Sequence, residues 1–324
     1  MRAINNGDTN NPAIADIAKL VKLRFGTKDL KFFPRLMAKN PLMGNHQSRF
    51  RGRGMDFEEV RQYQPGDDIR TIDWRVTART TTPHTKLFSE ERERPVLIVT
   101  DLRANMFFGA QELKSVTACQ VAAALAWAGL NANDRVGGLI FGPEHQTDIR
   151  ARRSHHSVLQ LIHTLSDVSE QLIHAQSTHA KNTEEINSHV SLAKILEDTR
   201  RVALPGSTLF LVSDFHDLDQ KCEQHLFELA RHCDLNICHV YDELEAHLPP
   251  PANYQVTNGE QRFNLNTRKA DLRQQFEQQF KNRQAKIQTL CGKLRMGCLT
   301  FETAKPILPI LQQAYGRKKV RGRR

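Results

Sequence analysis

Two apolar segments, each closely followed by an aspartate, place the strongest constraint on how this chain folds. Residues 96–100 form a β-branched run that ends at Asp101, and residues 208–212 form a second run that shortly precedes Asp214. Segments with apolar residues at helical spacing come after both runs. Buried strands that alternate with helices are typical of a mostly parallel sheet covered on both faces. We therefore predict an α/β fold with a doubly wound, mostly parallel sheet.

The same alternation continues on either side of these segments. Further strands are predicted at residues 135–141, 236–241 and 298–302, with residues 146–150 returning beside the first of them. Asn258 and Gly259 predict the turn of a hairpin within residues 254–265. Helices are predicted at residues 13–23, 33–39, 111–130, 157–175, 185–202, 220–233 and 268–294, and a last short helix ends by Tyr315.

Changes of composition divide the chain into five parts. We predict an N-terminal arm (residues 1–45), a β-containing extension (46–94), an α/β core (95–248), a C-terminal part with the hairpin, a long helix and the last strand (249–315), and a basic tail (316–324).

Charge and apolar content narrow the class of protein. The net charge is +10, but six of these positive charges lie in the tail, so the rest of the chain is only weakly basic and nucleic-acid binding is not expected of it. No apolar run approaches the roughly 20 residues of a membrane span, and no secretory signal is visible. The six cysteines lack zinc spacing. We expect a soluble cytoplasmic protein with free thiols.

Sequence patterns for catalysis are missing. The chain contains no nucleophile elbow, no P-loop and no dinucleotide-binding glycine motif after a strand. A role in protein binding is therefore predicted instead of an enzymatic one. Two alternatives stay open: a hydrolase that uses the strand-end carboxylates Asp101 and Asp214, and a nonspecific nucleic-acid binder that uses the basic tail.

The segment from Gly54 to Arg79 carries a specific resemblance. It contains an R-x-Y-x-P-G-D-D-x-R-x-I-D-W pattern that strongly resembles the defining motif of the domain of unknown function 58 family. The resemblance extends over about residues 45–315. It implies a bacterial protein with a von Willebrand factor A-like domain behind an N-terminal extension. It also implies a partner, a MoxR-type AAA+ ATPase, since members of the family commonly accompany such enzymes.

The motif side chains allow three interpretations. They could surround a turn at Pro65 and Gly66 and form ion pairs that lock the β element onto the core, they could form a docking surface, or they could be an acid/base cluster of an enzyme. The residues concerned are Arg61, Tyr63, Pro65, Gly66, Asp67, Asp68, Arg70, Asp73, Trp74 and Arg79.

The resemblance also implies a place for a metal. Von Willebrand factor A domains usually bind Mg²⁺ through a D-x-S-x-S motif together with a later threonine and aspartate. Asp101 and Asp214 match the two acids, but Arg103 and Asn105 replace the serines. The threonine position falls near residues 190–191.

Arg103 argues against a bound metal. A guanidinium and a divalent ion about 4 Å apart repel by about 8 kcal/mol at an effective dielectric constant near 20. We hypothesise that Arg103 takes the place of the metal, bridges Asp101 and Asp214, and offers a bidentate contact to an acidic group of a partner. The alternative is that Arg103 points into solvent and that either a weakly bound metal or nothing lies between the two acids. The predicted function is that of a non-catalytic adaptor that assists assembly or maturation of a complex together with the ATPase.

Overall fold

The structure is a computed structural model that describes residues 13–32, 55–65, 67–90, 95–143, 145–179, 190–257 and 262–316. The chain divides into two units. Unit 1 comprises Met1–Pro34 and Arg94–Arg324, and unit 2 comprises Arg35–Glu93. The helix predicted at 33–39, the predicted turn at 258–259 and the tail beyond residue 316 lie outside the described residues.

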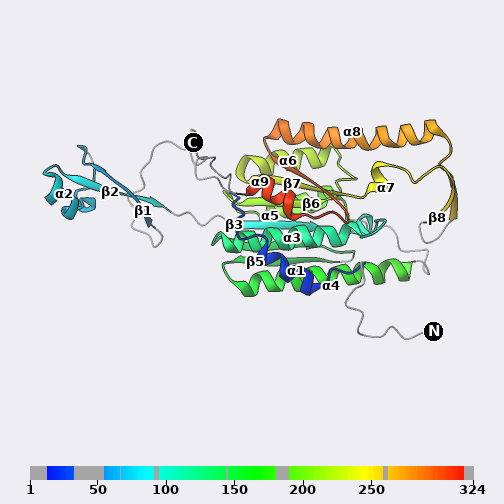
Figure 1. Cartoon of the computed structure of the whole chain (residues 1–324), viewed down its shortest axis with the longest axis horizontal. Helices are drawn as coiled ribbons and strands as arrows, with labels where there is room; N and C mark the ends of the chain where they lie inside the picture. The colour runs from blue at the N-terminus through cyan, green and yellow to red at the C-terminus, as the bar shows by residue number, and fades with distance from the viewer. Residues whose placement is uncertain are drawn as a thin grey trace, which may run out of the picture. The chain divides into compact units, whose positions relative to one another are not determined.

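A six-stranded sheet forms the centre of unit 1 (Figure 1). Its order is β10-β7-β6-β3-β4-β5, and every neighbouring pair is parallel except β4 and β5. The predicted doubly wound, mostly parallel sheet is therefore confirmed. The strands are β3 (Pro95–Asp101), β4 (Arg135–Phe141), β5 (Gln146–Arg152), β6 (Thr208–Ser213), β7 (Asp234–Tyr241) and β10 (Gly297–Glu302).

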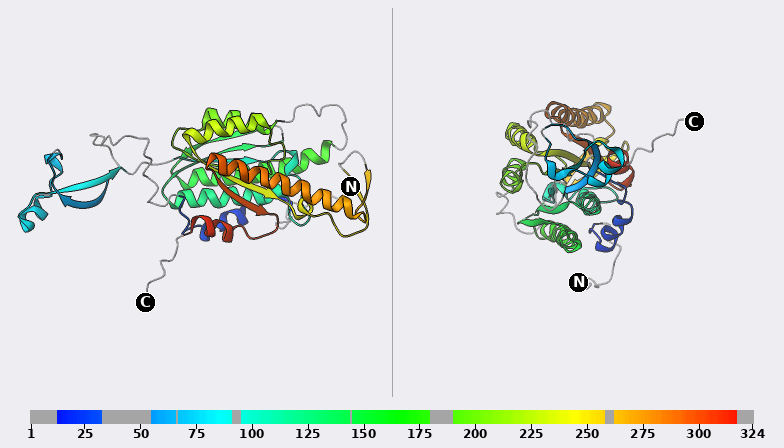
Figure 2. Two further views of the ribbon diagram at one scale, coloured as in Figure 1. Left: turned by 90° about the horizontal axis from the view of Figure 1, so that it is seen from above. Right: turned by 90° about the vertical axis from the view of Figure 1, so that its left-hand side faces the viewer.

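Helices cover both faces of this sheet, as Figure 2 shows. The first core cluster lies between one face and α1 (Ile17–Lys22), α3 (Lys114–Asn131), α4 (His155–His179) and α9 (Leu308–Tyr315). The second lies between the other face and α5 (Leu192–Val202), α6 (Gln220–His232) and α8 (Ala270–Leu294). Almost every residue of α3 is buried, because its many alanines allow neighbours to approach from all sides.

The described part of the N-terminal arm, with α1 and η1 (Leu23–Phe25), packs into the first cluster. The Trp127 indole N–H donates to the Leu20 carbonyl at 3.2 Å, and the Phe32 ring lies 4.8 Å from the Phe210 ring. Burial of these aromatic rings means that the described part of the arm also stabilises unit 1.

Most differences from the predicted elements are at helix ends. The helix predicted from residue 185 begins at Leu192, because the Ser191 hydroxyl accepts the Lys194 N–H and caps it. The turns η3 (Ala104–Met106) and α7 (Glu243–Ala246) were not predicted. β8 (Asn253–Thr257) and β9 (Arg262–Asn266) form the predicted antiparallel hairpin.

Unit 2 is a two-stranded antiparallel sheet with two helical turns between its strands. β1 (Met55–Gln62) pairs with β2 (His84–Glu90), and the register shifts between residues 57 and 59. Between them, η2 (Ile69–Thr71) and α2 (Trp74–Thr80) are capped by the carboxylates of Asp68 and Asp73.

Two further observations concern the residues within the described ranges. None of their helices combines the length and apolar character that crossing a membrane requires. All six cysteines are free; four are buried, Cys233 is half-buried and Cys298 is exposed.

Candidate functional site

The candidate site lies where the strand order of the sheet reverses. The chain proceeds from β3 to β4 on one side of β3, and β6 returns to pair with its other side. The loops after β3 and β6 therefore leave the sheet next to each other, and this crevice is where open α/β sheets bind ligands. Asp101 ends β3 and Asp214 follows β6, as the sequence predicts.

Arg103 forms the first of two charged clusters here. Its Nε and Nη2 donate to the two Asp101 oxygens at 2.9 and 2.8 Å. Nη1 and Nη2 donate to the Asp217 carboxylate at 2.9 and 3.1 Å, and Nη1 also donates to the Val190 carbonyl at 2.7 Å. A guanidinium has five N–H groups, and these five contacts use them all.

The hypothesis for Arg103 is therefore wrong in two respects. The guanidinium bridges Asp101 to Asp217, not to Asp214. It also retains no N–H for a bidentate contact with a partner, because every donor is already bonded within the chain. Burial lowers the pKa of Arg103, but its hydrogen bonds to Asp101 and Asp217 outweigh that effect and raise the pKa, so the group stays charged.

Asp217 completes this cluster from the loop after β6. Its carboxylate also accepts the backbone N–H of Leu192 at 2.8 Å, at the start of α5. Burial raises the pKa of Asp217, but the hydrogen bonds from Arg103 and Leu192 outweigh it and lower the pKa overall. Asp217 therefore joins three segments of unit 1: the loop after β3, the loop after β6 and the first turn of α5.

Lys114 forms the second cluster. Its ammonium donates to Asp214 at 2.7 Å and to Glu245 at 2.8 Å, and its side chain is only 2% exposed. The Asn105 amide donates to the other Asp214 oxygen at 2.8 Å. Burial lowers the pKa of Lys114, but the attraction of Asp214 and Glu245 outweighs it and raises the pKa. This cluster joins the first residue of α3 to the residue after β6 and to α7.

The residues present do not fit the metal that the fold family implies. Both serine positions of the expected motif hold nitrogen donors that already bind the acids, and Ser191 caps α5 with its hydroxyl. Asp101 accepts four hydrogen bonds, from Arg103 and from the Ser213 hydroxyl. Within the described residues, no group of three or more His, Cys, Asp or Glu side chains is arranged to hold a metal ion. Two cations instead lie where a divalent ion would have to bind.

The rim of the two clusters is negative and partly apolar. Four carboxylates accompany two cations, a formal net charge of −2. The Asp217 side chain is 38% exposed, whereas Asp101 and Asp214 are buried. Phe108 is 42% exposed, and the Lys114 ammonium lies 5.8 Å from the centre of its ring. The exposed groups of this edge therefore include a carboxylate, that of Asp217, and an aromatic ring, that of Phe108.

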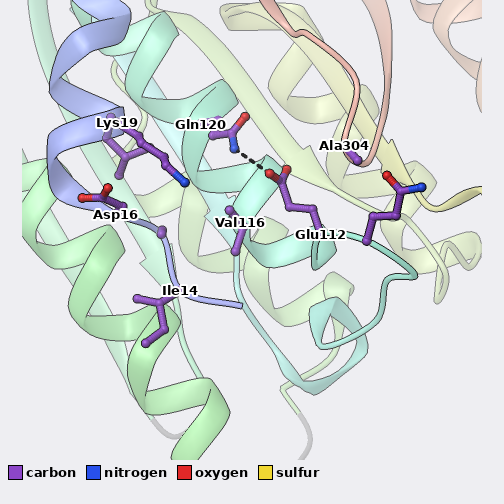
Figure 3. Close-up of a pocket in the computed structure, with 10 residues that line it drawn as sticks. Ile14, Asp16, Lys19, Glu112, Val116, Gln120 and Ala304 are labelled. Atoms are coloured by element: carbon purple, nitrogen blue, oxygen red, sulfur yellow. Dashed lines mark hydrogen bonds between the residues drawn. The ribbon is translucent and has the colours of Figure 1, made fainter. Parts of the chain in front are cut away.

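A separate cavity of about 230 Å³ lies near the start of α3. In Figure 3, Asp16, the N-cap of α1, and Lys19 of α1 lie on one side and Glu112 on the other, where Glu112 accepts a hydrogen bond from Gln120. Asp101 and Asp214 are not among its lining residues, so it does not belong to the charged clusters. The lining residues are Ile14, Ala15, Asp16, Lys19, Leu20, Gln111, Glu112, Val116, Gln120 and Ala304.

In unit 2, the acidic residues of the sequence motif stabilise its own loop. Asp67 accepts from the Arg61 guanidinium at 2.7 Å and from the Gln64 N–H at 2.9 Å. Asp73 caps α2 and pairs with Lys86 at 3.3 Å. The interpretation as a lock onto the core stays a prediction, because these contacts all lie within the unit.

The remaining motif residues separate into two groups. Tyr63 donates to the Asp67 carbonyl, and Asp68 caps η2. Pro65, Arg70, Trp74 and Arg79 are exposed, and Gly66 lies outside the described residues.

Sequence reasoning missed three of the six charged groups of the site: Lys114, Asp217 and Glu245. Lys114 is the first residue of α3 and the only charged residue in that helix. This single charge in an otherwise uncharged, largely apolar helix was the sequence signal that could have indicated a buried, paired lysine. Asp217 lies only three residues after Asp214, but the sequence does not show which of the two acids would face Arg103.

Comparisons with known proteins place the chain in a family. The model of the family described as "Protein of unknown function DUF58" matches residues 59–286. "Uncharacterized protein Rv1480" of Mycobacterium tuberculosis and "Uncharacterized protein Mb1516" of Mycobacterium bovis are each 34% identical over 163 residues, 49% of this chain and 49% of each relative. The chain thus spans about half the length of the curated relatives it matches.

Two solved structures are similar at low scores. One is BatB from Bacteroides thetaiotaomicron, at 12% identity and a TM-score of 0.40, covering 68% of this chain and 93% of that one. The other is the SpRpn10 VWA domain, at 10% identity and a TM-score of 0.35, covering 70% of this chain and 98% of that one.

Proposed function

This chain belongs to the DUF58 family, and we propose that it is a non-catalytic protein that binds another protein at the rim of its two charged clusters. The observation that carries the proposal is the complete internal pairing of the strand-end acids. Asp101 accepts four hydrogen bonds and Asp214 accepts three, from Asn105, Lys114 and the His216 N–H. Carboxylates held in this way are poor general bases, since proton uptake would break their ion pairs.

The chemistry of the rim indicates what kind of group it would bind. With a formal charge of −2, an exposed carboxylate at Asp217 and an exposed ring at Phe108, it suits a segment that carries a basic side chain next to an apolar one. This replaces the acidic partner group expected from the sequence, because the Arg103 donors that would have bound such a group are all used internally.

The identity of the partner comes from the family resemblance. We propose a MoxR-type AAA+ ATPase in the cytoplasm, with which this chain assists assembly or maturation of another complex. A hydrolase that uses Asp101 and Asp214 is the competing function, and a screen of ester and phosphate substrates tests it. Turnover that disappears in the Asp214→Asn variant would favour the hydrolase.

The test of the binding function compares two exposed phenylalanines. Phe108 is 42% exposed at the rim, and Phe227 is 51% exposed on α6. Tagged wild type, Phe108→Ala and Phe227→Ala are used to capture partners from the cells that produce the protein, with ATP present, and the captured proteins are identified by mass spectrometry.

We expect an AAA+ ATPase with the wild type and the Phe227 variant, and a recovery reduced about tenfold or more with Phe108→Ala, because buried aromatic residues dominate binding energies. Equal recovery with the two variants would refute the proposed place of binding. Unfolding midpoints of both variants check that the fold is retained.

A further inference from the structure

A second candidate surface lies on unit 2, and we name it the Trp74 face. We define it by the exposed large apolar and basic side chains of η2 and α2, which are Ile69, Arg70, Trp74, Arg75 and Arg79. Ile69 is 66% exposed and Trp74 is 68% exposed. Among the other large apolar side chains of the described residues, only Phe25, at 67%, is as exposed as Ile69. A tryptophan and an isoleucine that are so exposed within six residues of one another indicate an interaction surface.

The geometry of α2 explains why these side chains point outward. Thr77 and Thr80 lie toward the strands, since the Thr77 hydroxyl accepts the His84 N–H and the Thr80 hydroxyl bonds the His84 ring, both at 3.0 Å. Arg75 and Arg79 are four residues apart and thus neighbours on one face of the helix. The small side chain of Ala78 is also exposed. It lies four residues after Trp74 and leaves space beside the indole.

The charges of the Trp74 face are unbalanced. The aspartates of the same loop are used internally: Asp67 pairs with Arg61, Asp68 accepts the Arg70 backbone N–H, and Asp73 pairs with Lys86. Among the residues that the structure describes, no hydrogen bond or ion pair engages the guanidinium groups of the face. These three arginines therefore keep all their N–H groups for a partner.

We propose that the Trp74 face binds an acidic polypeptide segment that carries at least one apolar side chain. Arginine forks bind carboxylates through two parallel hydrogen bonds, and exposed tryptophan and isoleucine provide the apolar anchor. This proposal does not rest on the proposed function of unit 1, because the two surfaces share no residue and have opposite charge.

A nucleic acid is the less suitable occupant of the same face. A base stacks on an aromatic ring, and Ile69 has no ring, so the indole of Trp74 is the single ring of the face on which a base could stack. A protein segment can place its carboxylates on the arginines and its apolar side chain on the isoleucine and the indole. The combination of arginines with an exposed isoleucine therefore favours an acidic protein segment.

Selection from a random peptide library identifies what the face binds. A library of displayed 12-residue peptides is selected on the full chain and counter-selected on the Trp74→Ala variant. We expect the recovered peptides to be enriched in Asp and Glu together with a large apolar residue. Recovery of peptides without acidic enrichment, or of the same peptides on both proteins, would overturn the proposal.

The fluorescence of the chain then measures binding at the face itself. The sequence has only two tryptophans, and Trp127 is buried whereas Trp74 is exposed. Acrylamide, a collisional quencher, therefore acts mainly on Trp74. Titration with a selected peptide should protect this fluorescence from quenching. The same peptide with its apolar residue changed to Ser should bind at least about tenfold more weakly. Protection by a single-stranded oligonucleotide and not by the peptide would show a nucleic-acid surface and overturn the proposal.

Variants on the face and away from it complete the test. Trp74→Ala should weaken binding of a dye-labelled peptide about thirtyfold, the effect of losing one dominant aromatic contact. Arg75→Gln with Arg79→Gln should weaken it about tenfold. Arg75→Lys with Arg79→Lys should weaken it less, because lysine keeps the positive charge but lacks the planar guanidinium that binds a carboxylate through two hydrogen bonds. Phe263→Ala, which removes an exposed ring from β9, should not affect binding.

The unfolding midpoint of each variant separates binding from folding. Because Trp74 is exposed, we expect Trp74→Ala to unfold at the wild-type midpoint. A midpoint several degrees lower would mean that the ring is packed within the chain, and it would overturn the proposal.

Discussion

Substitution of Lys114 by methionine tests whether the second charged cluster holds the end of the sheet together. Lys114 binds Asp214 and Glu245 at 2.7 and 2.8 Å from a side chain that is almost fully buried. Hydrogen bonds to charged groups contribute about 1.5–3 kcal/mol each, so the two together contribute about 3–6 kcal/mol. Removal of one partner of a buried ion pair costs about 3–5 kcal/mol, which agrees.

The expected loss is measured by urea unfolding, followed by far-ultraviolet circular dichroism. With a slope of about 3 kcal/mol per molar urea, a loss of 3–5 kcal/mol lowers the midpoint by about 1–1.7 M. Lys194→Met is the matched control, because Lys194 also contacts two carboxylates, Glu197 and Asp198, but is exposed. An exposed ion pair contributes little, so this control should unfold near the wild-type midpoint.

A double variant protects this prediction from a failure to fold. Lys114→Met combined with Asp214→Asn removes the buried charge that the single variant leaves without its main partner, so part of the lost stability should return. Equal midpoints for Lys114→Met and the wild type would refute the reasoning. A double variant that loses more stability than the sum of the losses of the two single variants would refute it as well.

Three further predictions follow from the structure. First, the difference between the unfolding midpoints of the wild type and Lys114→Met should shrink as the pH rises above 10.5, the ordinary pKa of lysine. The pKa of Lys114 is raised by folding, so its stabilising effect is complete below 10.5 and is lost as the pH passes the pKa of the folded state. Unfolding curves across alkaline pH check this. Second, millimolar Mg²⁺ should leave the melting temperature unchanged, because two cations already pair with the acids, and a rise of several degrees would contradict this. Third, Gly137→Ala should lower the free energy of unfolding by about 1–3 kcal/mol, because the added Cβ would lie 2.7 Å from the backbone of Ile149 and Ala151. Gly292→Ala, inside α8, places its Cβ where no atom lies within 4 Å, and it should raise the free energy of unfolding by about 0.5–1 kcal/mol. Urea unfolding measures both variants.

The sheet could be predicted because its strands carry unambiguous patterns. β3 and β6 are apolar runs, buried almost throughout in the structure, and each is closely followed by an acid. A buried strand of a parallel sheet requires such a run, and the helices that follow require apolar spacing on one face. The predicted positions of Asp101 and Asp214 at one edge follow from the same rule, since parallel strands end on the same side.

The pairing of the site could not be predicted in this way. Asp214 and Asp217 are three residues apart in one loop, and their directions depend on the backbone between them. Phe215 adopts a φ of +51°, a left-handed conformation that is uncommon for a bulky residue. No pattern in the sequence predicts this turn, so the sequence could not show that Asp217, and not Asp214, would face Arg103. Lys114 was missed because a lysine at the start of a helix is usually exposed.

The two surfaces differ in how much of their charge is available to a partner. Unit 1 contains four carboxylates and two cations at its sheet edge, yet most of their hydrogen bonds join parts of the same unit. Variants of those residues will therefore lower stability before they report on binding. Near the Trp74 face, the aspartates of the loop bind groups within unit 2, and the three arginines of the face keep their donors. A substitution there changes what a partner meets while leaving the contacts of the unit intact. For this chain, the arginines of unit 2 therefore offer a cleaner route to a binding partner than the acids that the fold places at its sheet edge.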